Sequence, residues 1–593
     1  MDRLSYLSRA PQKPLNWKKP TIGAVLAIVI LSFIYLVYSA VQTEFHLSRI
    51  KSQVLQAHLN NGQVTTERAA DLLQGIRVDV AAAHKFSTGP VWWTAAHIPF
   101  LGRTPTAIRT ITSNLNHAFD ATSGLEATLR KSKPNTSLSN LKYILSLSNA
   151  LTELKEPIRQ GNVEINSLNL SGVPGLVAKP VKQLGSGFAN LAPVTADAKM
   201  FSEIAPALLG IDRPRKWMLV FQNGAEARSV GGFPGGWGIL TASAGRLKLS
   251  QLYKETGIMR QPLANWRDYV TAGQADLYGS DLSRFSDMNL SPDFPTNARL
   301  MSALEEQNFG QQVDGVISMN EHSLANFMQV TGPVKINGRE ISADNAVEYV
   351  TRGVYQDYSD PQQKDAAIFL IIEKTFAKFQ SGAIGPARLL QAFIPAIHSK
   401  NLHAWAKEKS VQTKIAKSPI GGSVANLNNP TSAVVLINGA GNKLDAYVKA
   451  NINYEQGVCE TDFPFRDSTI KVSLNNTAPT SGLPAYVTTR FDLGNMHPKN
   501  PGATKMLVYI HVPLGSVFES ATVANKEVLP VSEGTDLDRE VWRFDIELPA
   551  QSTHSVELKF AEPALGGEPR PTLWTQSMPN LVKAKVIAGL GCN

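Results

Sequence analysis

The 593-residue chain contains few cysteines, few charged side chains and only one long apolar run, and each shortage excludes a class of protein. Two cysteines are too few for a fold held by a disulfide framework or for a metal centre of several cysteines. Charged residues make up 18% and hydrophobic residues 43% of the chain, so it can bury apolar cores, which excludes a largely disordered protein. At roughly 100–200 residues per domain, the length predicts about three to five folded units.

Strong catalytic and nucleotide-binding motifs are also absent. The sequence has no H-E-x-x-H, no paired C-x-x-C, no G-x-x-x-x-G-K-[ST] and no G-x-S-x-G. The net charge is +9, of which residues 1–20 supply +4, so the other 573 residues carry only +5. Because no basic stripe lies inside a predicted domain, we expect no nucleic-acid partner.

The single long apolar run covers residues 21–42, TIGAVLAIVILSFIYLVYSAVQ, without one charged residue. About 20 apolar residues are the length that a helix needs to cross the hydrocarbon core. Five basic residues precede the run and should stay in the cytoplasm. A cleaved signal peptide is the alternative, but the run is too long and Tyr38 spoils a cleavage site before Ala40. The sequence predicts a single-pass cell-membrane protein, with a cytoplasmic tail (1–20), a transmembrane helix (21–42) and an extracytoplasmic remainder.

Three patterns divide the predicted extracytoplasmic part. Apolar residues at three- and four-residue intervals predict a helical region, or stalk, over residues 43–212. Strands that alternate with helices predict an α/β domain over 213–445. From 446 to 593, alternating apolar and polar residues between Asn-, Gly- and Pro-rich turns predict an antiparallel β-sandwich. The predicted fold class is therefore a multidomain α+β protein with a single transmembrane helix.

Two pairs of residues leave alternatives open. Trp92 and Trp93 in the helical region either rest on the bilayer surface or pin two helices together as core aromatics. Cys459 and Cys592 bracket the predicted sandwich, and in an oxidising exterior they would form a disulfide. Two free cysteines are the alternative.

The segment from Gln222 to Gly232, QNGAEARSVGG, is the strongest candidate site. It places Glu226 and Arg228 directly after a predicted strand, where ligands of α/β sheets bind. Glycines such as Gly231 and Gly232 allow backbone N–H groups to face an anion, and an arginine can hold a phosphate through two hydrogen bonds. The alternative is an internal Glu226–Arg228 ion pair beside a tight turn.

This part of the sequence resembles a bacterial family known as domain of unknown function 4012. The resemblance is carried by RKWMLVFQNGAEARSVGGFPGGWGILTASAGRL around the candidate site. It continues in NLSPDFPTNARLM (289–301), VDGVISMNEHSLANFMQVTGPVKING (313–338) and ADNAVEYVTRGVYQDY (343–358), and upstream in GPVWWTAAHIPFLGRTPTAI (89–108).

The order of these segments is more distantly similar to the LytR-CpsA-Psr family of membrane-anchored envelope enzymes. Those enzymes transfer glycopolymers from polyprenyl-pyrophosphate carriers to peptidoglycan, using acids that hold a divalent metal and arginines that hold the pyrophosphate. The similarity implies that Glu226 and Arg228 lie at the metal and phosphate loop, and that Arg352 and Lys364 match later basic positions. The chain departs from that pattern because its S-I-P-R-D segment is missing and its R-x-R pair is reduced to Arg352.

These resemblances imply a site and two possible functions. Glu226, Arg228, Gly231, Gly232, Arg352 and Lys364 are expected to border one anion- or pyrophosphate-binding cleft, with Glu226 as the candidate metal ligand. The first function is a non-catalytic envelope protein that contacts the lipid bilayer and binds a polyprenyl-phosphate-linked or wall glycopolymer. The second is a phosphotransferase that attaches glycopolymers to peptidoglycan, with Mg²⁺ or another divalent cation as its cofactor.

Overall fold

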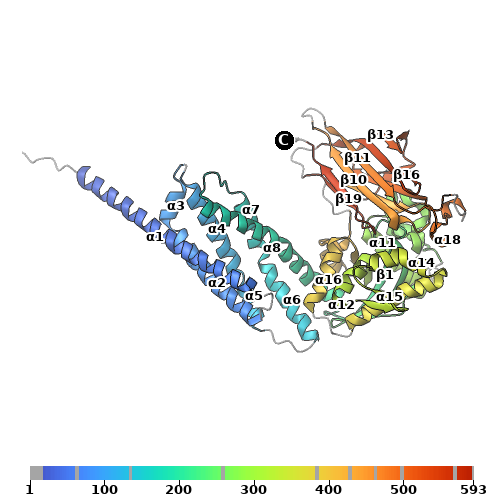
Figure 1. Cartoon of the computed structure of the whole chain (residues 1–593), viewed down its shortest axis with the longest axis horizontal. Helices are drawn as coiled ribbons and strands as arrows, with labels where there is room; N and C mark the ends of the chain where they lie inside the picture. The colour runs from blue at the N-terminus through green and yellow to red at the C-terminus, as the bar shows by residue number, and fades with distance from the viewer. Residues whose placement is uncertain are drawn as a thin grey trace, which may run out of the picture. The chain divides into compact units, whose positions relative to one another are not determined.

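The computed structural model describes residues 18–59, 66–99, 101–131, 137–254, 261–380, 386–424, 431–459, 464–494, 500–564 and 570–589. The chain forms a mixed α/β fold with many helices and several sheets (Figure 1). It divides into two compact units. The first comprises Met1–Asn135 and Lys142–Ser202, and the second comprises Thr136–Leu141 and Glu203–Asn593.

The first unit is helical. Its core lies between α2, α4, α7 and α8, where small and aliphatic side chains recur at helical spacing. Gly161 allows close packing, because a Cβ atom there would lie 2.2 Å from the ring of Phe188. The helices are α1 (Lys18–Leu59), α2 (Thr66–Ser87), α3 (Pro90–Ala96), α4 (Arg103–Asp120), α5 (Ser123–Arg130), α6 (Ser137–Glu153), α7 (Lys155–Asn166) and α8 (Gly175–Leu208), the last of which continues into the second unit.

Helix α1 contains the apolar run. Within the part of the chain that the structure describes, Ile28–Gln53 is the one segment long and apolar enough to cross a membrane, with a mean hydropathy of 1.6. Its apolar side chains face outward, since Ile28, Leu31 and Phe33 are 62%, 65% and 64% exposed. The helix does not end with the run but continues to Leu59 and packs against α2. The predicted N-terminal apolar helix is confirmed.

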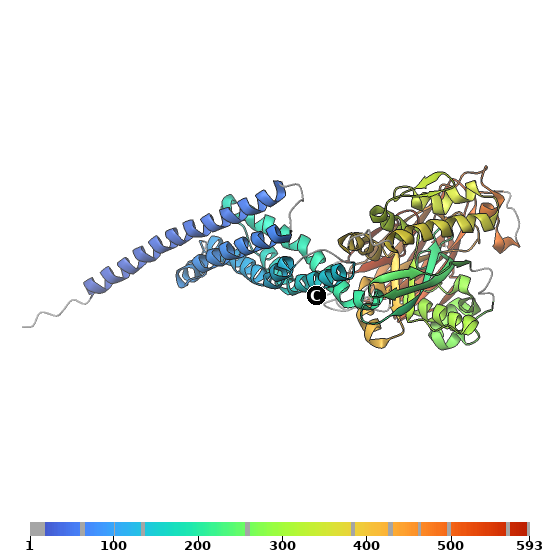
Figure 2. The ribbon, with the colours of Figure 1, turned by 90° about the horizontal axis from the view of Figure 1, so that it is seen from below.

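The second unit begins with a mixed sheet in the order β3-β2-β1-β5-β8, with β4 paired to β2. Only β1 and β5 are parallel; the other neighbours are antiparallel. Figure 2 shows α15 and α16 (yellow) on one side of the green strands and α10 and α11 (lime green) on the other. The strands are β1 (Arg215–Asn223), β2 (Phe233–Ser243), β3 (Arg246–Leu249), β4 (Tyr253–Lys254), β5 (Gly315–Met319) and β8 (Leu402–Ala406), and a separate hairpin pairs β6 (Val334–Ile336) with β7 (Arg339–Ile341).

The helices of this part surround that sheet. They are α10 (Ala272–Tyr278), α11 (Phe294–Phe309), α12 (Glu321–Thr331), α13 (Ala346–Glu348), the π-helical turn η4 (Tyr349–Gly353), α14 (Val354–Asp357), α15 (Pro361–Gln380), α16 (Pro386–His398) and α17 (Lys409–Ala416), with short 3₁₀ turns η1 (Trp266–Tyr269), η2 (Gly279–Ser283), η3 (Phe285–Asp287) and η5 (Pro419–Gly421).

Two further sheets share a second core. Their orders are β14-β13-β17-β11-β10-β19 and β15-β16-β12-β9-β18. Alternate side chains of β10 point into this core, as expected for a strand with one buried face. The elements are β9 (Thr431–Asn438), η6 (Asp445–Tyr447), β10 (Val448–Gln456), β11 (Phe465–Asn476), α18 (Ala485–Thr488), η7 (Phe491–Leu493), β12 (Thr504–Pro513), β13 (Val517–Val523), β14 (Lys526–Val528), β15 (Ser532–Thr535), β16 (Arg539–Leu548), β17 (Ser552–Pro563), β18 (Thr572–Thr575) and β19 (Lys583–Ile587).

Strand β9 corrects the predicted boundary between 445 and 446. It lies before that boundary but pairs with β12 and, in parallel, with β18. Val434 and Leu436 face the core between the two sheets, whereas Val435 and Ile437 face the core that contains β1 and α11. A strand buried on both faces has no polar alternation, so its run of apolar residues gave no sign of which neighbours it joins. The sheets and the α/β part therefore pack as continuous layers.

Most strand pairs of the predicted antiparallel sandwich are antiparallel, but β19 pairs with β10 in parallel, as β18 does with β9. Cys459 is buried just beyond β10. Cys592 lies outside the described residues, so the disulfide stays a prediction.

Candidate functional site

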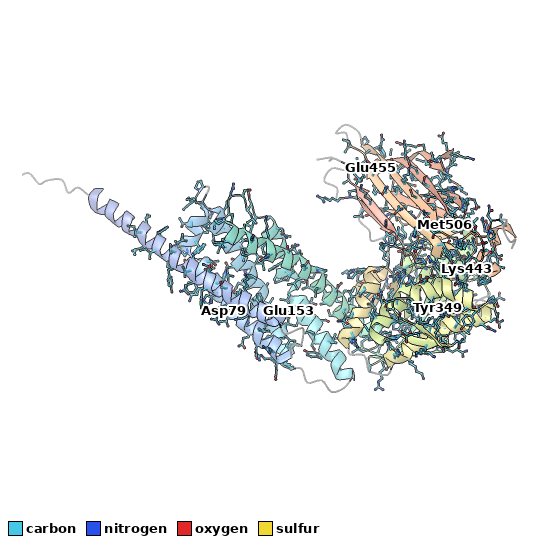
Figure 3. The ribbon with its side chains drawn as sticks, in the orientation of Figure 1. Asp79, Glu153, Tyr349, Lys443, Glu455 and Met506 are labelled. Carbon is cyan, nitrogen blue, oxygen red and sulfur yellow. The ribbon has the colours of Figure 1, made fainter. Side chains whose placement is uncertain are left out.

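A cleft of about 610 Å³ lies in the second unit, where the first sheet, α15 and the segment after β9 meet. It combines five basic and three acidic side chains with several aromatic rings. Lys443, which Figure 3 labels, enters from the segment between β9 and β10. The packing of the two sheets against the α/β part therefore completes the cleft.

The turn between β1 and β2 positions Glu226 and Arg228. The backbone N–H of Phe233 donates to the Glu226 carbonyl at 2.8 Å, and that of Ala227 donates to the Asp445 carboxylate at 2.7 Å. These bonds fold the turn back on the end of β1, so Glu226 and Arg228 are 4% and 7% exposed.

Gly231 and Gly232 close this turn and do not line the cleft. Their φ angles are +96° and +112°, a region that glycine adopts without strain. A Cβ atom on Gly232 would lie 2.4 Å from the backbone of Asn223. The carbonyl of Gly232 accepts a hydrogen bond from the Asn289 side chain at 2.8 Å. The two glycines thus allow the chain to turn back tightly against β1. Their predicted place at the edge of the cleft is wrong.

Glu226 is held between two cations. Arg228 Nη2 donates to Glu226 Oε1 at 2.8 Å, and Lys443 Nζ pairs with the other carboxylate oxygen. Burial alone would raise the pKa of Glu226, but the charges of Lys443 and Arg228 outweigh it and hold the pKa below its ordinary value. Arg228 also contacts Asp287 at 3.2 Å. The predicted Glu226–Arg228 ion pair exists and forms part of a larger cluster.

A second carboxylate in the cleft is arranged in the same way. Asp365 lies 2.5 Å from Nζ of Lys364 through one oxygen and 2.5 Å from Nζ of Lys254 through the other. The ammonium group of Lys364 also lies 5.2 Å from the ring centre of Tyr355 and 5.3 Å from that of Tyr486. Burial, more than the nearby acids, raises the pKa of Tyr355 well above its ordinary value, so this phenol stays neutral.

Aromatic and aliphatic side chains form the rest of the wall. Phe233 lies under both cations of the first cluster, with its ring centre 5.5 Å from Arg228 Cζ and 5.3 Å from Lys443 Nζ. Phe369 approaches β2 closely because Gly236 has no side chain; a Cβ atom there would lie 2.5 Å from its ring. Phe221 and Ile368 complete this apolar surface. The cleft can therefore hold a ligand that is anionic at one end and apolar or ring-shaped at the other.

Arg352 is not brought into the cleft. The π-helical turn η4 directs it to Tyr447, whose ring centre lies 4.5 Å from Arg352 Cζ, and its guanidinium donates to the Ala446 carbonyl. It lines a neighbouring pocket of about 10 Å³ that shares Tyr355 and Lys443 with the cleft. Of the predicted set, Glu226, Arg228 and Lys364 converge, and Arg352 lies beside them.

A divalent metal does not fit Glu226 in this arrangement. Both of its oxygens accept from cations, so a metal would first have to displace Arg228 or Lys443. Over the described residues, no three His, Cys, Asp or Glu side chains form a group able to hold a metal ion.

Sequence reasoning missed five of the eight ionic side chains in the cleft, namely Lys254, Arg284, Asp287, Asp365 and Lys443. Asp365 follows Lys364 directly and could have been included with it. Lys254, Arg284, Asp287 and Lys443 carry no local sequence signal that links them to the candidate site. Lys443, for example, is 217 residues from Glu226 along the chain.

The comparisons with known proteins place one segment in a family. Residues 212–355 match the family model described as "Protein of unknown function (DUF4012)". This stretch runs from the residues before β1 to α14 and includes Glu226 and Arg228, so the predicted resemblance to that family is confirmed there. The similarity to the LytR-CpsA-Psr enzymes stays a prediction. No curated protein matches the chain.

Among solved structures, the chain shows limited similarity to a nutrient binding protein of Legionella pneumophila. The identity is 8% and the TM-score 0.16, over 23% of this chain and 43% of that one. Two M1 zinc metallopeptidase structures, the second from Deinococcus radiodurans, are 12% and 10% identical with TM-scores of 0.12 and 0.11. They cover 21% of this chain each, and 22% and 21% of their own. The chain spans less than half of each, and scores of this size carry no argument about function.

Proposed function

We propose that the protein is a single-pass, membrane-anchored protein of the cell envelope whose cleft binds a polyprenyl-phosphate-linked or wall glycopolymer without transforming it. The observation that carries the proposal is the excess of basic over acidic side chains in a cleft that also has aromatic walls. In this proposal the amino-terminal tail (1–20) lies in the cytoplasm, and residues 43–593 lie outside it. Support for that orientation comes from the outward-facing apolar helix α1 and the basic residues before it.

The cations suit a phosphate. The five come from five separate places. These are the β1–β2 turn (Arg228), β4 (Lys254), the junction of η2 and η3 (Arg284), α15 (Lys364) and the segment after β9 (Lys443). Cations that converge from several elements can surround a phosphate, and a partly enclosed cleft concentrates their positive potential. Glu226 and Asp365 each neutralise part of the charge of two cations, and Asp287 contacts Arg228. Because five basic side chains face three acidic ones, the cleft keeps positive charge for a further anion.

The aromatic walls suit the rest of such a ligand. Sugar rings present apolar faces that pack on Phe or Tyr rings, and an isoprenoid chain gains free energy by leaving water for the same surface. Tyr355 and Tyr486 flank Lys364, so an apolar and a cationic contact lie side by side. A ligand with phosphate next to a sugar or an isoprenoid carbon would meet both.

The phosphotransferase alternative requires a rearranged cluster. Phosphoryl transfer depends on a positioned metal and on cations free to meet the transferred group. Glu226 instead uses both oxygens on Arg228 and Lys443, which supports binding over catalysis.

The test uses the full chain in nanodiscs titrated with polyprenyl monophosphate. Lys364→Gln should weaken binding by roughly tenfold, about 1.4 kcal/mol, because it removes one charge-assisted contact. Lys471→Gln is the matched control: Lys471 is 47% exposed and pairs with Glu557 outside the cleft. Equal affinity of both variants and the unmodified chain would refute the proposal. Release of polyprenyl phosphate from a lipid-linked glycopolymer in the presence of Mg²⁺ would establish the transferase instead.

A further inference from the structure

Exposed apolar side chains gather at the end of the helical unit from which α1 emerges. Trp93 in α3 is 55% exposed, and Ile98 and Leu101 in the turn after it are 46% and 72% exposed. Leu176, in the first turn of α8, is 92% exposed. Arg103 joins the two segments, because its guanidinium donates to the Ser171 carbonyl at 2.7 Å. We call Trp93, Ile98, Leu101 and Leu176 the apolar end of the unit.

A hydrogen bond fixes this apolar end at a defined position along α1. Trp92, the buried partner of Trp93, donates from Nε1 to Ser39 Oγ at 2.8 Å. Figure 1 shows α3 beside α1, in keeping with that bond. From the first residue of the charge-free run, Thr21, to Ser39 a helix rises about 27 Å, close to the thickness of a bilayer core of about 30 Å. The apolar end therefore begins where the membrane-crossing part of α1 would leave the hydrocarbon.

The two stretches of sequence that form this end contain basic but no acidic residues. The sequence has no acidic residue between Asp79 and Asp120, and none between Glu164 and Asp197. These two stretches contain α3, the turn after it, the α7–α8 connection and the start of α8. Two of their basic residues, Arg103 and Lys179, are exposed. Basic side chains around apolar ones are the composition that anionic lipid surfaces attract, and tryptophan favours the headgroup region.

The turn presents its side chains in a fixed form. Gly102 packs so closely that a Cβ atom would lie 2.1 Å from the Ala96 carbonyl oxygen. Its N–H donates to the Ile98 carbonyl at 2.8 Å, and the ring of Trp93 lies 4.1 Å from that of His97. A tightly packed turn therefore carries Ile98 and Leu101, and Trp93 is packed against His97 at its start.

We propose that this apolar end rests on the outer bilayer surface, with Trp93, Ile98, Leu101 and Leu176 among the headgroups of a membrane that contains anionic lipids. The inference rests on the membrane anchor of the proposed function. Two contacts, the crossing helix and this surface, would fix the direction in which the helical unit leaves the membrane. The first of the two alternatives for the tryptophan pair then applies to Trp93, and the second to Trp92.

The test places spin labels on the full chain in nanodiscs that contain phosphatidylglycerol. Labels at Leu101→Cys and Leu176→Cys should be several-fold more accessible to oxygen, relative to a water-soluble nickel complex, than a label at Leu191→Cys. Leu191 is a matched control because it is 49% exposed on the same helix as Leu176, about 22 Å further along. The unsubstituted chain, treated with the label, corrects for reaction at Cys459 and Cys592.

A label at Ile34→Cys distinguishes failure of the membrane anchor from failure of the surface contact. If it reports lipid while positions 101 and 176 are as water-accessible as 191, the anchor stands and the surface contact is refuted. If Ile34→Cys also reports water, the anchor itself fails. Loss of nickel accessibility at 101 and 176 without a gain of oxygen accessibility would indicate a protein partner or a second copy, and would overturn the proposal. Lower oxygen accessibility in purely phosphatidylcholine discs is the expected result for an anionic surface, and equal values in both lipids would refute that part.

Discussion

Replacing Lys443 by methionine tests the most tightly coupled ionic cluster in the cleft. The change keeps the apolar stem of the side chain and removes the cation that pairs with one oxygen of Glu226. The side chains of Glu226, Arg228 and Lys443 are 5%, 8% and 13% exposed, so water cannot replace the lost partner well. Removing one member of a buried ion pair costs about 3–5 kcal/mol. Because Arg228 remains at 2.8 Å, we expect about 3 kcal/mol.

The double variant supplies the decisive comparison. Glu226→Gln together with Lys443→Met leaves no uncompensated carboxylate, so the stability lost in Lys443→Met should return in large part. The coupling free energy between the two positions should therefore be about 2–3 kcal/mol. The pKa of Glu226 lies below its ordinary value of 4.5, so this stabilisation is complete above pH 4.5 and is lost as the pH falls through the lower folded-state value.

Urea unfolding of the full chain measures these differences, with hydrogen exchange of β1 and β2 showing that the second unit is the part affected. Strictly additive effects of the two substitutions, or a loss below about 0.5 kcal/mol for Lys443→Met, would refute the coupled cluster. Lys471→Gln again serves as the control for a lost surface cation, with an expected change within about 0.5 kcal/mol.

Three further predictions concern other parts of the chain. Glu305 in α11 is 1% exposed, neither of its oxygens has a hydrogen-bond partner among the described residues, and burial raises its pKa from 4.5 to about 8. The free energy of unfolding should therefore fall by about 1.4 kcal/mol per pH unit between pH 4.5 and about 8. Glu305→Met should be more stable than the unmodified chain by about 3 kcal/mol at pH 7. Thermal melts in which this difference in stability does not grow with pH would contradict the prediction. Cys459 and Cys592 should form a disulfide, because β10 pairs Glu455 with Ile587 and the cysteines follow these residues closely; complete alkylation without a reductant would reject it. Protease added to intact, wall-stripped cells should digest the chain after residue 42, and protection of the C-terminal sheets would reverse the proposed orientation.

Local features of the chain were open to sequence reasoning. A charge-free run of apolar residues specifies a helix that can span a membrane, because the ability to span depends on the length and composition of the run alone. Packing against other helices does not change it. The turn after β1 was equally visible, since Gly231 and Gly232 mark a tight return and Glu226 and Arg228 lie two residues apart. A match of residues 212–355 to a known family adds to this local evidence.

Only the tertiary structure decided which distant groups share one cleft. Lys443 reaches Glu226 because β9, buried on both faces, joins the sheets to the α/β part, and a uniformly apolar strand does not reveal its neighbours. Arg352 and Lys364 are twelve residues apart and equally basic, yet η4 turns the first toward Tyr447 while α15 carries the second into the cleft. Charge and spacing along a chain constrain which side chains are available, but long-range packing determines the direction in which each one points.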